Sequence, residues 1–404
     1  MKKYGKISPI LKYLSYVFFF VCCFILSRQV PFSHLSSIMN LALIGFIFCS
    51  FILARVNRVR YFAIQLWLVI LFLLLISYYS LFLGNDPELI SRFLVILFIM
   101  CASYHIKPDQ NYIYIAAFCF FIQAMVVIVL QFLLNFYFSA DYASTIRNLY
   151  ILKGWGDVYN YGYGLWNVQL KGNALLPFFC FVSFLIFQGW RRIIITSVFA
   201  ISCLFSGNFA FVLGFFSFFS LYTLIKVGRS MNKLRTFIVL CIATVLLSSS
   251  FVYKYITKVI EQKSGYSGQH RLEQTLALIG DMGDNYISAF FGKGLGNVNI
   301  SGFGFEFHNT IYFELQTLYI LNQLGVLFFI AFLFFNVFFT VKYIRYPVLI
   351  AVYISYVVYS FWNPYIFDTN HIVVIVVLVS LSHLMKNEKL GEVSVRHCYH
   401  PLQP

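Results

Sequence analysis

Long apolar stretches recur from one end of this chain to the other, and they decide what it can fold into. In hydrocarbon every backbone polar group needs an internal partner, which a helix provides. About twelve stretches are long enough to cross roughly 30 Å of membrane as helices, near residues 9–27, 35–54, 62–83, 89–105, 113–138, 174–189, 193–206, 208–226, 236–253, 320–341, 347–361 and 370–385. The division at "FSGN" (205–208) is the weakest of these boundaries, because a kink there would change the number of spans counted.

The composition agrees with a membrane protein. Hydrophobic residues make up 61% of the 404 residues and charged residues 11%, and the mean hydropathy is +0.81. Soluble domains do not reach such values. We therefore expect an all-α polytopic membrane protein in which residues 1–404 form a single integral membrane domain.

The charges predict an orientation, because cytoplasmic loops carry an excess of Lys and Arg. With both termini in the cytoplasm, the inner segments hold 19 of the 29 basic residues, while 11 of the 14 acidic residues fall outside. This orientation leaves two long periplasmic loops, at 139–173 and 254–319. The net charge of +15 follows mostly from this bias, so we expect no nucleic-acid partner.

The first long loop, 139–173, is rich in Tyr, Trp, Gly and Asn and contains Arg147, Lys153 and Lys171. Aromatic rings beside Asn and Asp are typical of sugar-binding surfaces, in which rings cover pyranose faces and polar groups bind hydroxyls. The alternative is an interfacial loop whose aromatic side chains lie at the level of the lipid headgroups.

The second long loop contains "HRLEQTLALIGDM", whose apolar residues recur at helical spacing. Since this helix is too short and too polar to span, we expect it to lie on the membrane surface with Arg271 at its N-terminal end. A guanidinium beside free backbone amides suits a pyrophosphate, and Lys293 in "GKGLGN" would add a second positive charge. Alternatively, Arg271 pairs with Glu273 or with a lipid headgroup.

The stretch "GFGFEFHNTIYFELQ" (302–316) places a polar cluster where this loop enters a span. On a helix, His308 and Tyr312 would share a face, whereas Glu314 would point elsewhere. A neutral imidazole facing a polar cavity can take a proton from a sugar hydroxyl, and Glu314 or another carboxylate can orient it. Asn309 would orient the imidazole or a hydroxyl. A lone interfacial His is more often simply solvated.

No metal or other cofactor is expected, because the chain has no HExxH and no Walker A motif. The nearest candidate for a metal site is "DMGD" (281–284), whose carboxylates are three residues apart.

The order of these features resembles the bacterial O-antigen polymerase (Wzy-type) and O-antigen ligase (WaaL-type) superfamily. The resemblance rests on about twelve spans, a large late outer loop, an Arg opening a loop helix, "GKGLGN", and "HN" followed by "LGVLFF". "KGNALLPFF" (171–179), with Lys171 and Asn173, is similar to another recurrent element of the superfamily.

The resemblance implies a metal-independent, inverting glycosyltransferase of the GT-C-like kind. It would act at the periplasmic face of the bacterial inner membrane on glycans linked to undecaprenyl pyrophosphate. Arg271 would bind the donor pyrophosphate, and His308 would serve the acceptor. The family often has an Arg at the outer turn where this chain has "SGNFAF" (206–211), so the phosphate contact expected there is either missing or supplied by another residue such as Arg92, Arg147 or Lys171.

We expect a polymerase that joins lipid-linked repeat units, with the bilayer and a chain-length regulator protein as further partners. An O-antigen ligase, which transfers glycan to the lipid A core, would use the same donor. A flippase would show two similar halves, short outer loops and charges within its spans. A purely structural membrane scaffold would need neither Arg271 nor His308.

Overall fold

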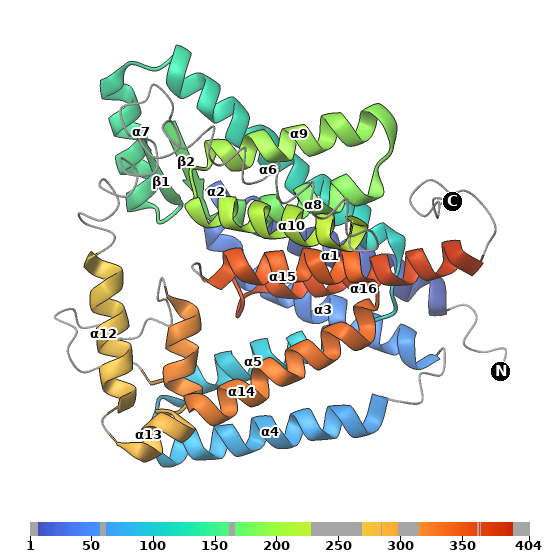
Figure 1. Cartoon of the computed structure of the whole chain (residues 1–404), viewed down its shortest axis with the longest axis vertical. Coiled ribbons are helices and arrows are strands. Elements are labelled where there is room, and N and C mark those ends of the chain that lie inside the picture. Colours follow the sequence, from blue (N-terminus) through green and yellow to red (C-terminus); the bar gives the residue numbers. More distant parts are fainter. Residues whose placement is uncertain are drawn as a thin grey trace.

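The structure, a computed structural model, describes residues 7–56, 62–160, 166–227, 269–283, 285–297, 315–361, 363 and 365–390. The helices that lie side by side along one direction (Figure 1) are α1 (Ile7–Ser27), α3 (Ser36–Val56), α4 (Phe62–Phe82), α5 (Pro87–Ser103), α6 (Gln110–Phe136), α8 (Leu176–Ile186), α9 (Gly189–Phe205), α10 (Phe209–Val227), α14 (Gln316–Ile344), α15 (Pro347–Phe361) and α16 (Thr369–Leu390). The chain is therefore an all-α bundle, as its apolar runs predict.

Several of these helices can cross a membrane. By length and hydropathy, six ranges among the described residues qualify: Pro9–Ser27, Gln29–Ala54, Gln110–Phe136, Phe209–Lys226, Gln316–Ile344 and Thr369–Asn387. Shorter apolar helices accompany them at Leu68–Phe82, Lys171–Ile186 and Pro347–Phe361. The chain is thus a membrane-embedded helical protein.

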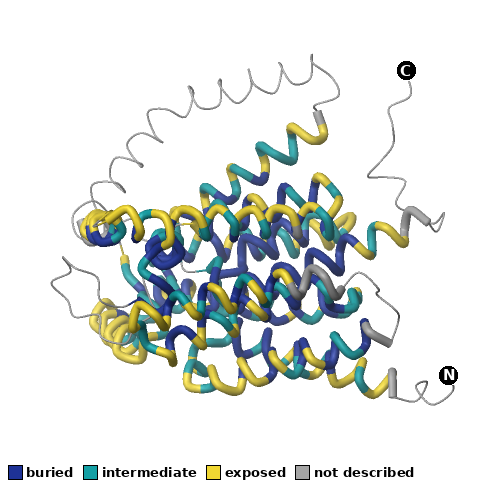
Figure 2. Tube along the Cα trace, turned by 90° about the horizontal axis from the view of Figure 1, so that it is seen from below, coloured by how far each residue is buried: buried dark blue, intermediate teal, exposed yellow. Residues whose placement is uncertain are grey.

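Helix α16 lies at the centre of the bundle. Nearly every side chain from Thr369 to Ser382 is buried, and Figure 2 shows the buried segments gathered at the middle of the molecule. A helix that is apolar all round needs neighbours on all sides, which explains this position. The valines of "HIVVIVVLV" leave no polar face that could be turned to water.

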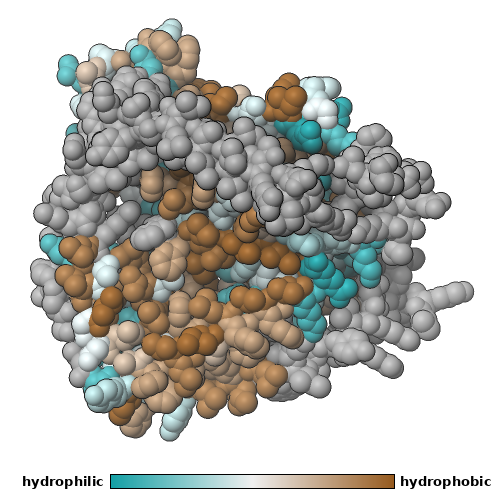
Figure 3. All heavy atoms as spheres, viewed as in Figure 1, coloured by the Kyte–Doolittle hydropathy of each residue, from teal (hydrophilic) through white to brown (hydrophobic). Residues whose placement is uncertain are grey.

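Other helices expose a stripe of large apolar side chains. On α14 the exposed residues recur every three or four positions, at Val326, Leu327, Ile330, Leu333, Phe334, Val337, Phe338 and Val341. Helix α4 shows the same pattern at Leu68, Leu71, Leu74, Leu75, Tyr78 and Leu81. Figure 3 shows hydrophobic side chains covering the part of the surface where these two helices lie. Exposed apolar surface of this extent suits contact with lipid.

The remaining elements gather at one end of the bundle, which contains the two loops predicted to be periplasmic and which we therefore call the outer end. They are α2 (Gln29–Phe32), η2 (Ser33–Leu35), α7 (Ala140–Leu152), β1 (Gly156–Asn160), β2 (Trp166–Leu170), η3 (Lys171–Leu175), α12 (Gln269–Gly283) and α13 (Tyr286–Phe291). Helix α1 begins and helix α16 ends at the opposite end (Figure 1). Strands β1 and β2 form an antiparallel hairpin in which Val158 faces Val168. Both long loops therefore contribute structure to the same end.

An ion pair ties α1 to α6 at the opposite, inner end. Asp109 caps α6 by accepting a hydrogen bond from the Asn111 N–H at 3.0 Å, and its carboxylate lies 2.9 Å from the Lys12 ammonium. Burial by itself would raise the pKa of the Asp109 carboxyl. The Asn111 bond and the Lys12 charge outweigh burial, so this pKa lies below its ordinary value.

The predicted spans can be compared with these helices. Helices occupy every predicted range except 236–253, which lies outside the described residues. The division at "FSGN" is a true boundary, since α9 ends at Phe205 and α10 begins at Phe209. Gly207 has a φ of +61°, and a Cβ there would lie 1.9 Å from the Asn167 side-chain oxygen.

Candidate functional site

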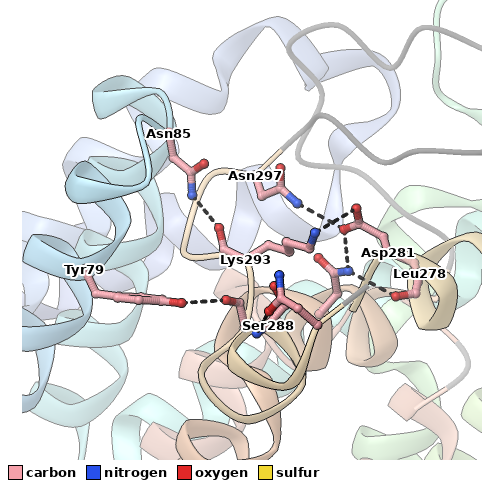
Figure 4. A network of polar contacts seen from close by, with 10 residues as sticks. Tyr79, Asn85, Leu278, Asp281, Ser288, Lys293 and Asn297 are labelled. Atoms are coloured by element: carbon pink, nitrogen blue, oxygen red, sulfur yellow. Dashed lines mark hydrogen bonds and ion pairs between the residues drawn. The ribbon is translucent and has the colours of Figure 1, made fainter. Parts of the chain in front are cut away.

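A network of polar contacts surrounds the carboxylate of Asp281 at the outer end (Figure 4). Asp281, near the end of α12, is only 4% exposed. Its Oδ2 accepts hydrogen bonds from the Asn322 side-chain amide at 2.9 Å and from that of Asn297 at 3.4 Å. Its Oδ1 lies 3.5 Å from the Lys293 ammonium. The buried charge thus has three donors around it, as a buried carboxylate requires.

The "GKGLGN" loop, residues 292–297, lies against a break in α14. Gly325 has a φ of +64° inside that helix. The Lys293 N–H donates to the Asn322 carbonyl at 2.9 Å, and the Gly294 N–H donates to the Gln323 carbonyl at 3.0 Å. The loop therefore supplies donors to carbonyls next to the point where the helical pattern is interrupted.

Glycine is required on both sides of this contact. A Cβ on Gly292 would lie 2.2 Å from the Gln323 carbonyl oxygen, and a Cβ on Gly325 would lie 2.2 Å from the Gly292 nitrogen. Both residues also have φ values in the region that favours glycine. Two glycines far apart in the sequence thus allow the two backbones to touch.

The same loop is bound to the last turns of α4 and to the turn between α4 and α5. The Tyr79 hydroxyl donates to the Gly292 carbonyl at 2.9 Å, and the Asn85 amide donates to the Lys293 carbonyl at 2.8 Å. The Leu295 N–H donates to the Ser80 hydroxyl at 2.8 Å. Figure 4 shows the Tyr79 and Asn85 side chains reaching the loop. The loop joins α4, α5, α12 and α14 at the outer end.

These contacts occupy Lys293. Its side chain is 22% exposed and lies beside Asp281, so it neutralises a buried carboxylate in this conformation. Its predicted role as a second phosphate contact stays a prediction. Asp281, one of the two carboxylates of "DMGD", is bonded to amide donors and paired with an ammonium, whereas Asp284 lies outside the described residues.

Helix α12 runs crosswise to the bundle helices at the outer end (Figure 1). It begins at Gln269 and places the Arg271 backbone in its first turn, which agrees with the helix predicted there. Its buried side is formed by Gln274, Ala277, Leu278 and Asp281, whereas Leu272, Leu276 and Ile279 are 59%, 64% and 48% exposed. An exposed apolar face on a crosswise helix suits the lipid interface, as predicted for this segment.

The first long loop forms a helix and a hairpin. Arg147 on α7 donates two hydrogen bonds to the Asp157 carboxylate, at 2.9 and 3.1 Å, and its guanidinium lies 5.9 Å from the centre of the Tyr159 ring. The Trp155 indole donates to the Ser33 hydroxyl at 3.1 Å. Arg147 thus has a carboxylate partner and a half-exposed position, and its predicted contact with substrate stays a prediction.

The short helix η3 holds Lys171 and Asn173 on one turn. Asn173 is 3% exposed, accepts a hydrogen bond from the Gln123 amide at 2.9 Å, and donates to the Val168 carbonyl at 2.8 Å. These bonds connect η3 to α6 and β2, so Asn173 positions the turn rather than projecting from it. Lys171 is exposed at the outer end.

No protein-family model, curated protein or solved structure matches this chain. Functional inference therefore depends on the chain's own residues.

Of the other predicted residues, the structure describes the side chain of Arg92. Arg92 lies in the second turn of α5, near its outer end, where it pairs with Glu88 and is exposed. The Arg271 side chain lies outside the described residues, and so do His308, Asn309, Tyr312 and Glu314. The structure thus brings Lys171 and Asn173 onto one turn and leaves Arg92 at a different corner of the outer end.

The turn between α15 and α16 contains polar groups that the sequence analysis did not single out. Asp368 accepts hydrogen bonds from the Thr369 N–H at 2.6 Å and from the Asn370 amide at 2.5 Å. Burial raises the pKa of the Asp368 carboxyl, although both bonds oppose the rise. His371 lies one turn further, with its Nε2 at 3.1 Å from the Tyr353 hydroxyl. The sequence "FDTNH" offered a signal, namely a helix cap at the mouth of an apolar run.

Proposed function

We propose that this protein is an O-antigen polymerase, a glycosyltransferase that joins oligosaccharide repeat units linked to undecaprenyl pyrophosphate. It works at the periplasmic face of the bacterial inner membrane, with twelve spans and both termini in the cytoplasm. The observation that carries the proposal is the crosswise helix α12 at the outer end of an apolar bundle, with Arg271 in its first turn. The position of α12 supports a site that meets a lipid-linked substrate at the membrane surface.

The chemistry needs few parts. Polyprenyl pyrophosphate is a good leaving group, so transfer requires neutralisation of its charge, a positioned acceptor and a base. Arg271 neutralises the pyrophosphate, and His308 removes the proton from the acceptor hydroxyl. Asn309 orients the imidazole or a hydroxyl, Glu314 or another carboxylate orients His308, and Tyr312 contacts the substrate. The aromatic and amide groups of the first outer loop support sugar binding above the membrane.

The test is reconstitution of the purified full chain with synthetic undecaprenyl-pyrophosphate repeat units. Longer lipid-linked glycans formed without any lipid A core support the polymerase. Growth only after core is added would make the protein a ligase, and translocation without a new glycosidic bond would make it a flippase.

The site assignment is tested by Arg271→Ala and His308→Ala. Both should abolish long glycans while leaving the protein in the membrane, whereas Lys386→Gln, an exposed cation at the end of α16 far from the outer end, should not. A wild-type ladder of chain lengths from both variants would refute the assignment.

A further inference from the structure

Arg28 lies where α1 ends, between the last residue of α1 and the first of α2. Its backbone N–H donates to the Phe24 carbonyl at 2.8 Å, so the backbone of Arg28 continues the hydrogen-bond pattern of α1. The side chain therefore sits at the outer end of a membrane helix. The sequence shows only a single Arg after an apolar run, which gave no reason to single it out.

The guanidinium of Arg28 is partly buried and incompletely bonded. Its Nη1 is shielded from solvent and has no hydrogen-bond partner in the described part of the chain. Burial lowers the pKa of Arg28, and the nearby Tyr150 hydroxyl opposes that shift. Tyr150 itself packs edge-on against Trp155, with ring centres 5.5 Å apart. A charged group with a shielded N–H and no acceptor is unfavourable, so an anion bound at this N–H would stabilise it.

A second cation lies next to it. A Cβ on Gly172 would lie 2.2 Å from the Ser27 carbonyl oxygen, so the backbone of η3 touches the end of α1. Ser27 directly precedes Arg28, and Lys171 directly precedes Gly172. The Lys171 N–H is held by the Trp155 carbonyl at 3.1 Å. The backbones at these two basic residues therefore lie side by side, and the Lys171 ammonium lies beside Gly154, four residues after the Tyr150 that neighbours Arg28.

Neither cation has an ion pair with any residue that the structure describes. The nearest carboxylate in the hairpin, Asp157, is already bound by both donor groups of Arg147. An unpaired guanidinium favours an anionic ligand, because its planar donors fork onto phosphate oxygens, and an unpaired ammonium nearby adds a second positive charge.

We propose that Arg28 and Lys171 form a binding site for a phosphate ester at the outer membrane interface. In the proposed polymerase this ester is the pyrophosphate of a lipid-linked substrate, and that part of the inference rests on the proposed function. The other source of the same chemistry is the headgroup of an anionic phospholipid. Trp155 and Tyr150 form an aromatic wall beside the site.

The test measures binding to the purified full-length protein in a neutral detergent. The probe is a fluorescent farnesyl pyrophosphate, a short polyprenyl pyrophosphate, and farnesol is the uncharged control. We expect Arg28→Gln to weaken probe binding about tenfold, the loss expected for one charge-assisted contact, and Lys171→Gln to weaken it several-fold. Arg28→Lys should retain part of the affinity. Lys386→Gln removes one charge at the opposite end and should leave binding unchanged.

A second arm identifies the source of the phosphate. Native mass spectrometry counts phosphatidylglycerol molecules that remain bound to each variant. Weaker probe binding with unchanged phosphatidylglycerol supports the lipid-linked substrate. Loss of phosphatidylglycerol with unchanged probe binding assigns the site to a lipid headgroup and overturns the substrate form of the inference.

Unchanged binding of both ligands in Arg28→Gln and Lys171→Gln overturns the site altogether. Lys171 is exposed, so its variant tests the site even where Arg28→Gln does not fold. The outcome is separable from the proposed function: a protein that binds the probe through Arg28 but forms no glycan refutes only the polymerase.

Discussion

The pair formed by Asp281 and Lys293 allows the structural role of the "GKGLGN" loop to be measured. We expect Lys293→Met to destabilise the protein, because it leaves the 4% exposed Asp281 carboxylate without a counter-charge. At the observed 3.5 Å separation, an effective dielectric constant of about 20 gives an attraction of about 5 kcal/mol. Desolvation offsets much of this, and removal of one partner from a buried pair typically costs about 3–5 kcal/mol. Since Lys293 retains some solvent contact, we expect about 3 kcal/mol.

A double-mutant cycle separates the pair from its surroundings. Asp281→Asn keeps an oxygen that can accept from Asn322, so it should cost about 2 kcal/mol. The double variant should also cost about 2 kcal/mol rather than the sum of about 5, which gives a coupling of about 3 kcal/mol. The free energy of unfolding is obtained by SDS titration of the purified protein in mixed micelles.

Two outcomes would contradict this reasoning. Additive effects of the two substitutions would show that the two charges do not interact. Unchanged stability of Lys293→Met together with weaker binding of a polyprenyl pyrophosphate would return Lys293 to its predicted role as a phosphate contact.

Three further predictions concern other contacts. Gly325→Ala should lower the free energy of unfolding by about 3 kcal/mol or more, because of its positive φ and the close Gly292 backbone. The control Gly280→Ala in α12 has open space around it and should not lower this free energy. Equal effects of the two substitutions would contradict the contact between Gly325 and Gly292. Power-saturation EPR in a bilayer tests the position of α12. A nitroxide attached at Leu276→Cys should be relaxed by oxygen, whereas one attached at Glu273→Cys should be relaxed by a water-soluble nickel chelate. Equal accessibility at the two positions would place α12 away from lipid. Because the pKa of Asp109 is lowered on folding, its stabilisation is present above the ordinary carboxyl value of about 3.9 and is lost as the pH falls through the lower folded value. In thermal melts, the Tm of the wild type should therefore be higher than that of Asp109→Asn at pH 7, and the difference in Tm should shrink toward pH 3. A difference in Tm that does not change with pH would exclude the Lys12 pair as its cause.

The helices were predictable because every backbone polar group inside hydrocarbon needs a partner within its own span, which a helix provides. Helix α15 occupies its predicted range of 347–361, and the break at "FSGN" follows from Gly207. The surface helix α12 was predictable from its own periodicity, since the apolar face that it exposes is a local property of the sequence.

The polar contacts were not predictable, since they depend on which distant segments meet. Lys293 in "GKGLGN" suggested a phosphate contact, whereas the structure places Gly292 of this loop against α14 and Lys293 beside Asp281. Asp281 belongs to "DMGD", the nearest candidate for a metal site, and its actual partners Asn297 and Asn322 could not be read from the sequence because they lie 16 and 41 residues away. Arg28 carried no signal at all, because its burial depends on η3 and Tyr150.

The break in α14 bears on how the chain assembles. An interrupted helix entering a bilayer exposes carbonyls that lipid cannot satisfy, and each would cost several kcal/mol. Here the donors at Lys293 and Gly294 are synthesised before the acceptors at Asn322 and Gln323. The loop is therefore already synthesised when α14 emerges, and its N–H groups can pair with the carbonyls that the interrupted turn leaves open. Insertion of α14 and docking of the loop should accordingly be a single event during biogenesis.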